Sequence, residues 1–109
     1  MEYEADYGLK IIQHLGLYDQ LNFTDRNNFR EHWAWVLRKH RNDPIEATID
    51  LFGSILPMSR DMSKIKRSET GELRTRKEFI EDKMDEFKIR EHFEAGRLNQ
   101  LLEMYQVDD

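Results

Sequence analysis

Cysteine is absent from this chain of 109 residues. Its absence excludes disulfides, zinc–thiolate sites, iron–sulfur clusters and cysteine nucleophiles. Long hydrophobic runs are also missing, since no stretch approaches the roughly 18 apolar residues that a membrane span requires. The acidic segment 1–6 lacks the apolar region of a secretory signal. We therefore expect a cytoplasmic protein with no membrane segment and no disulfide framework.

Proline and glycine are scarce, at two and five residues, and no alternating apolar run indicates a strand. Charged residues make up 36% of the chain, and the net charge is −5. This composition is typical of helices with solvated outer faces. The length suffices for one core. We expect an all-α fold, a compact bundle of four to six short helices around a single core, that forms one domain over residues 1–109.

Apolar residues recur at helical spacing in several stretches. The pattern predicts helices over residues 7–15, from Thr24 or Asp25 to residue 41, and over residues 44–56. Farther along, the stripe formed by Ile80, Met84 and Phe87 is out of phase with Ile89 and Phe93. Either one long helix has two apolar faces, or the helix breaks between Lys88 and Gly96. The phase change and the glycine favour the break.

Both tryptophans fall in the second predicted helix. At 100° per residue, one arc of that helix holds Phe29, Trp33, Val36, Leu37 and His40. Trp35 points about 150° away from the centre of that arc. The spacing therefore predicts that Trp33 lies in the core and that Trp35 lies on the surface.

The sequence contains no motif that is typical of a particular chemical reaction. The four histidines do not form metal-ligand pairs, and the serines lack the context of an activated nucleophile. The acidic residues of segment 78–86 follow a pattern typical of a solvated helix face, and no phosphate-binding loop occurs. We therefore expect a non-enzymatic protein that has no cofactor, no metal and no small-molecule substrate.

A basic segment lies in the middle of the chain. Residues 60–77 contain seven cations against three acids, and residues 58–77 contain few large apolar side chains, which predicts a mobile segment. Such clustering can bind phosphates, although no aromatic is present for base stacking. Nucleic-acid binding is therefore the alternative function, through Arg60, Lys64, Lys66, Arg67, Arg74, Arg76 and Lys77.

The exposed tryptophan carries the principal hypothesis. Tryptophan and arginine are enriched where proteins bind one another, and Ile89 with Phe93 is a candidate second apolar patch. We predict a protein–protein interaction module, such as a small helical adaptor, inhibitor or assembly factor, that binds a protein partner or self-associates. The predicted interface consists of Trp35, Arg38, Lys39, Ile89 and Phe93.

Overall fold

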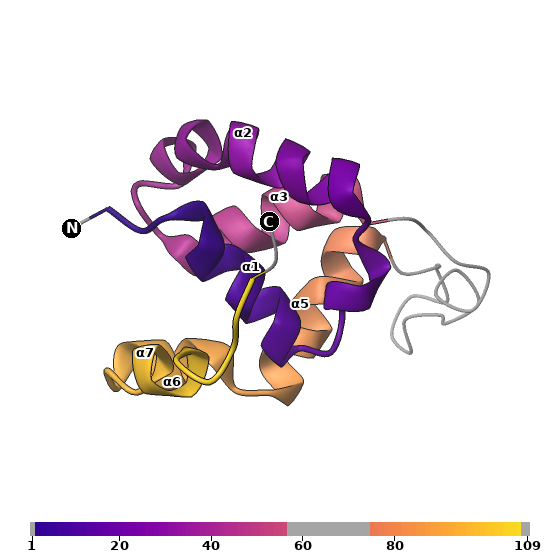
Figure 1. The fold of residues 1–109 in the computed structure, drawn as a ribbon. Coiled ribbons are helices and arrows are strands. Elements are labelled where there is room, and N and C mark those ends of the chain that lie inside the picture. Colours follow the sequence, from indigo (N-terminus) through magenta and orange to yellow (C-terminus); the bar gives the residue numbers. More distant parts are fainter. Residues whose placement is uncertain (1, 57–74, 108–109) are drawn as a thin grey trace.

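The computed structural model describes residues 2–56 and 75–107 of the chain. These ranges contain six α-helices, one 3-10 helix and no strand, which confirms the predicted all-α class (Figure 1). None of these helices is long and apolar enough to cross a membrane. The elements are α1 (Ala5–His14), η1 (Tyr18–Gln20), α2 (Phe23–Lys39), α3 (Pro44–Ile55), α5 (Arg76–Glu86), α6 (Ile89–Glu94) and α7 (Leu98–Leu102).

Short polar side chains fix where three of the helices begin. Asp43 accepts hydrogen bonds from the first turn of α3, and Thr75 forms a capping box with Glu78 at the start of α5. Helix α2 begins earlier than predicted, because Asn22 rather than Thr24 or Asp25 is the cap. Asp25 instead completes the capping box with Asn22.

Helices α2 and α3 lie side by side, and α1 packs against both (Figure 1). The indole of Trp33 stacks on Phe29 at 5.4 Å and donates to the carbonyl oxygen of Tyr3 over 2.9 Å. A Cβ atom added at Gly8 would lie 2.6 Å from the Trp33 ring. Glycine therefore allows α1 to approach the aromatic face of α2.

The C-terminal part of the chain divides into three helices, which confirms the predicted break. Lys88 adopts a left-handed conformation between α5 and α6, and Gly96 does so between α6 and α7. Ile89 is completely buried, so the prediction that it belongs to an exposed patch is wrong. Phe93 is partly buried and packs against Tyr3 at 6.0 Å. The turn at Lys88 redirects α6, and both side chains thereby face the core.

Candidate functional site

A groove lies between α2 and α3 on the side where Trp35 projects. It encloses about 460 Å³, which is within the usual range of binding sites in proteins. We call it the α2–α3 groove. Its lining consists of Asn28, His32, Trp35, Val36, Lys39, Asp50, Leu51, Ser54 and Ile55.

The apolar part of the groove has a floor of buried aliphatic side chains and one side formed by an exposed tryptophan. Val36 and Leu51 are almost fully buried, whereas Trp35 is 62% exposed. The Nζ atom of Lys39 lies 5.7 Å from the centre of the Trp35 ring, in the range of a cation–π contact. Trp35 therefore presents a large apolar surface to solvent beside a positive charge. The sequence-based division of the two tryptophans is confirmed, because Trp33 is 3% exposed.

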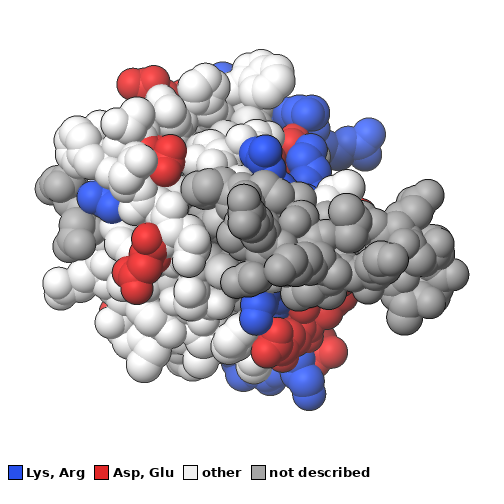
Figure 2. Space-filling model, turned by 90° about the vertical axis from the view of Figure 1, so that its right-hand side faces the viewer, with Lys and Arg blue, Asp and Glu red and all other residues white. Residues whose placement is uncertain are grey.

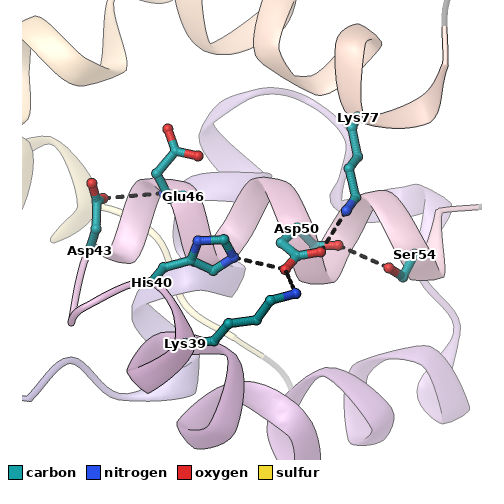
Figure 3. A network of polar contacts seen from close by, with 7 residues as sticks. All are labelled: Lys39, His40, Asp43, Glu46, Asp50, Ser54 and Lys77. Atoms are coloured by element: carbon teal, nitrogen blue, oxygen red, sulfur yellow. Dashed lines mark hydrogen bonds and ion pairs between the residues drawn. The ribbon is translucent and has the colours of Figure 1, made fainter.

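Asp50 is the centre of the polar contacts of the groove (Figure 3). Its Oδ2 atom lies 3.0 Å from Lys39 Nζ and 2.8 Å from His40 Nε2, and its Oδ1 atom accepts a hydrogen bond of 2.7 Å from Lys77 Nζ. The Asp50 side chain is only 14% exposed. This Asp50 cluster therefore joins the last turn of α2, the middle of α3 and the first turn of α5.

The contacts of Asp50 hold its carboxyl group in the ionised form. The hydrogen bonds from Lys77, then His40, then Lys39 lower the pKa of Asp50 far below its ordinary value, and they outweigh the partial burial that would raise it. One carboxylate thus faces two lysines, and the cluster carries a net charge of +1 when His40 is neutral. The positive charge of one lysine is left without a matching acid within the cluster.

Close packing between α3 and α5 brings Lys77 to Asp50. A Cβ atom added at Gly53 would lie 2.6 Å from Lys77 Cγ, so the lysine stem crosses α3 where there is no side chain. Asp50 and Lys77 are 27 residues apart in the sequence. Sequence reasoning missed Asp50, and the one available signal was its spacing of four from Glu46 and Ser54 on a predicted helix.

His32 contributes a ring nitrogen to the groove, and its hydrogen-bonding role follows from the contact made by the other ring nitrogen. Its Nδ1 atom lies 2.8 Å from the carbonyl oxygen of Asn28, which can only accept a hydrogen bond. The proton of the neutral ring is therefore on Nδ1, and Nε2 is left as an acceptor. The groove presents a donor at Lys39 and an acceptor at His32 on either side of Trp35.

The structure separates the residues of the predicted interface. Trp35, Arg38 and Lys39 are all exposed near the C-terminal end of α2, but Arg38 does not line the groove. Ile89 and Phe93 pack into the core through α6 and do not join them. The basic residues Arg60, Lys64, Lys66, Arg67 and Arg74 lie outside the described residues. Of that group the structure describes only Arg76 and Lys77, and Lys77 is paired with Asp50.

No group of three or more histidine, aspartate or glutamate side chains in residues 2–56 and 75–107 is arranged to hold a metal ion. Comparisons of the chain with protein-family models, with curated proteins and with solved structures found no match. The geometry of the α2–α3 groove is therefore the basis for a functional proposal.

Proposed function

We propose that this protein is a non-enzymatic protein–protein interaction module that binds its partner at the α2–α3 groove. Trp35 and Lys39 form the centre of the contact surface, whereas Arg38 is next to Lys39 in the sequence but does not line the groove. The observation that carries the proposal is the 62% exposure of Trp35 beside an apolar floor. Leaving so large an apolar side chain in water is unfavourable, and covering it on binding recovers that free energy.

The surrounding structure makes Trp35 a rigid contact. It lies in the 17-residue helix α2, which packs on α3 and α1, and it belongs to the residue types that dominate binding energy at interfaces. Since the helix backbone is already ordered, little conformational entropy is lost when a partner covers the ring. A small helical adaptor, inhibitor or assembly factor fits these properties.

The chain offers a matched control for Trp35. Phe23 is also an exposed aromatic of α2, at 58% exposure, but it does not line the groove. The photoreactive residue p-benzoylphenylalanine is placed at position 35 or at position 23 of the full chain. Irradiation in the expressing cells should give protein adducts from position 35 that position 23 does not give. Equal adducts from both positions, or none from position 35, would contradict the proposal.

A second comparison separates binding from folding. Trp35→Ala should retain helicity by circular dichroism and change the free energy of unfolding by less than about 1 kcal/mol, as for a surface site. Trp33→Ala should cost about 3–5 kcal/mol, because it leaves a large cavity in the core. Urea unfolding measures both variants, and equal losses would assign Trp35 to the core.

A further inference from the structure

Among the residues that the structure describes, the Asp50 cluster beside the α2–α3 groove has one more lysine than carboxylate. The Asp50 carboxylate already has two hydrogen-bond partners besides Lys39, namely Lys77 at 2.7 Å and His40 at 2.8 Å. Lys39 remains 52% exposed, and an ammonium group has three donor protons. In Figure 2, Lys and Arg side chains gather at the upper right of the face turned to the viewer, around a small area of Asp and Glu, and a larger area of Asp and Glu lies lower on the same side.

The positive charge of Lys39 lies directly beside the apolar surface of the groove. Its Nζ atom is 5.7 Å from the centre of the Trp35 ring, and the aliphatic residues Val36, Leu51 and Ile55 line the same groove. A binding partner that matches both features must place an apolar side chain against Trp35 and a carboxylate next to Lys39. Such complementary charge fixes the register of the bound segment.

We propose that the α2–α3 groove binds a short acidic and apolar peptide segment of a partner protein. The carboxylate of the segment accepts a hydrogen bond from Lys39, and its apolar side chain covers Trp35 and Leu51. His32 Nε2 accepts a hydrogen bond from a backbone amide or hydroxyl of the segment. This inference rests on the proposed function and adds the chemistry of the partner.

Two other occupants fit the groove less well. A small molecule is normally buried over most of its surface, whereas the wall formed by Trp35 is 62% exposed. Single-stranded nucleic acid needs aromatic faces on which successive bases stack, and the floor of the groove is aliphatic instead. A peptide segment tolerates a wall open to solvent, and its backbone spans the groove between the two helices.

The test begins with selection of random dodecapeptides, displayed on phage, against the full chain and against its Trp35→Ala variant. Peptides that depend on Trp35 should combine a large apolar residue with a nearby aspartate or glutamate. The most enriched peptide is then synthesised together with a counterpart in which every carboxylate is replaced by an amide. Calorimetry measures the affinity of both peptides, and the indole NMR signal of Trp35 reports where they bind.

The matched variants are Lys39→Gln and Arg38→Gln, which remove the same charge from neighbouring exposed residues. The carboxylate peptide should bind wild type about tenfold more tightly than the amide peptide, because the amide peptide lacks the charged contact with Lys39. A tenfold change in affinity corresponds to about 1.4 kcal/mol. In Lys39→Gln this difference should disappear, and in Arg38→Gln it should remain. A difference that survives in Lys39→Gln would overturn the inference.

Other outcomes also overturn it. Selection of basic peptides, or of no peptide that depends on Trp35, contradicts the stated chemistry. Displacement of the peptide by oligo-dT would assign the groove to nucleic acid. Self-association in light scattering that the peptide reverses would assign it to a second copy of this chain. Photo-adducts from position 35 combined with any of these results would leave the proposed interaction module standing while removing the acidic segment as its partner.

Discussion

Asp50 is the residue on which the polar contacts of three helices converge. Its carboxylate contacts Lys39 of α2, the C-cap residue His40 that follows α2, and Lys77 of α5 (Figure 3). Hydrogen bonds that involve a charged group are stronger than those between neutral groups. Asp50 therefore stabilises the packing of α2 and α5 on α3, and it holds the Lys39 ammonium beside Trp35.

Replacement of this residue gives a stability prediction with a defined dependence on pH. Asp50→Asn should lower the free energy of unfolding by about 1–3 kcal/mol at pH 7, because hydrogen bonds to a charged group are lost. The native contacts lower the pKa of Asp50, so their stabilisation is present above about pH 4, the unfolded value, and is lost as the pH falls below it. The difference between wild type and Asp50→Asn should therefore shrink in acid.

Urea unfolding at pH 7 and at pH 3 measures that difference. The control is Asp19→Asn, which makes the same chemical change at an exposed residue of η1 and should alter the stability by less than about 0.5 kcal/mol. An Asp50→Asn variant as stable as the Asp19→Asn control at pH 7 would show that the Asp50 cluster does not stabilise the fold.

Single residues were predictable from sequence when helix geometry alone decided their environment. The spacing of α2 predicted the burial of Trp33 and the exposure of Trp35, and both are confirmed. The Asp50 cluster was not predictable, since it depends on the approach of α5 to α3 at Gly53. Sequence patterns describe which face of a helix is apolar, but they do not say which distant side chain reaches that face.

At the scale of the element, left-handed residues determine how successive helices are joined. After α1, the Gly16 amide donates to the carbonyl oxygen of Gln13 and the Leu17 amide donates to that of Ile12, which is a Schellman ending. Gly96 ends α6 in the same conformation, with φ of 74°. These glycines mark helix ends in the sequence, because a left-handed residue is favourable for glycine and costly for other residues.

The backbone at Lys88 explains why Ile89 and Phe93 of α6 are not on the surface, where the sequence predicts them. Lys88 has φ of 55° and ends α5 without glycine, so nothing in its side chain marks the turn. Ile89 and Phe93 would lie on an outer face only if each residue from α5 onward turned the helix by the same angle. One left-handed residue breaks that assumption. The break itself was predictable from the change of phase, but the direction of α6 was not.

The left-handed turn predicts a stabilising substitution. Lys88→Gly should raise the free energy of unfolding by about 0.5–1 kcal/mol, since relief of the left-handed strain exceeds the added entropy of the unfolded chain. Ala95→Gly is the matched control at the end of α6, where φ is −82°, and it should lower stability by about 0.5–1 kcal/mol. Thermal and urea unfolding measure both. Destabilisation by Lys88→Gly would show that this turn carries no strain.

At the scale of the whole molecule, contacts between the two ends of the chain close the structure. Tyr7 of α1 donates to Asn99 of α7 over 3.0 Å. His14 Nδ1, at the end of α1, lies 2.8 Å from the hydroxyl oxygen of Tyr105. The His14 and Phe87 rings are also arranged edge to face, with their centroids 5.5 Å apart. The segment after α7 is thereby held against α1, although the partners are more than 90 residues apart.

These contacts lie beyond the reach of sequence reasoning. The all-α class follows from composition and apolar spacing, because those properties act over a few residues. Contacts between His14 and Tyr105 depend instead on the two turns, at Lys88 and Gly96, that lead the chain back to α1. A small change in the backbone angles at either turn would move Tyr105 away from His14. The contact between the two ends of the chain therefore depends on the whole fold.

The closure around His14 predicts a pH dependence of stability. Burial lowers the pKa of His14 below its ordinary value of 6.5, and the nearby His92 lowers it further. The unfolded chain therefore takes up a proton near pH 6.5 while the folded chain does not. Stability from the neutral His14 is complete above pH 6.5 and falls as the pH drops toward the lower folded value.

Proton NMR of the His14 ring during a pH titration measures the folded value directly. The midpoint should lie below 6.5 in wild type. His92→Gln should raise that midpoint, since protonated His92 repels a second positive charge. His32→Gln changes an exposed histidine on α2 and should leave the midpoint unchanged. A wild-type midpoint at or above 6.5 would mean that water reaches the ring freely, and hence that the segment containing Tyr105 does not remain docked on α1 in solution.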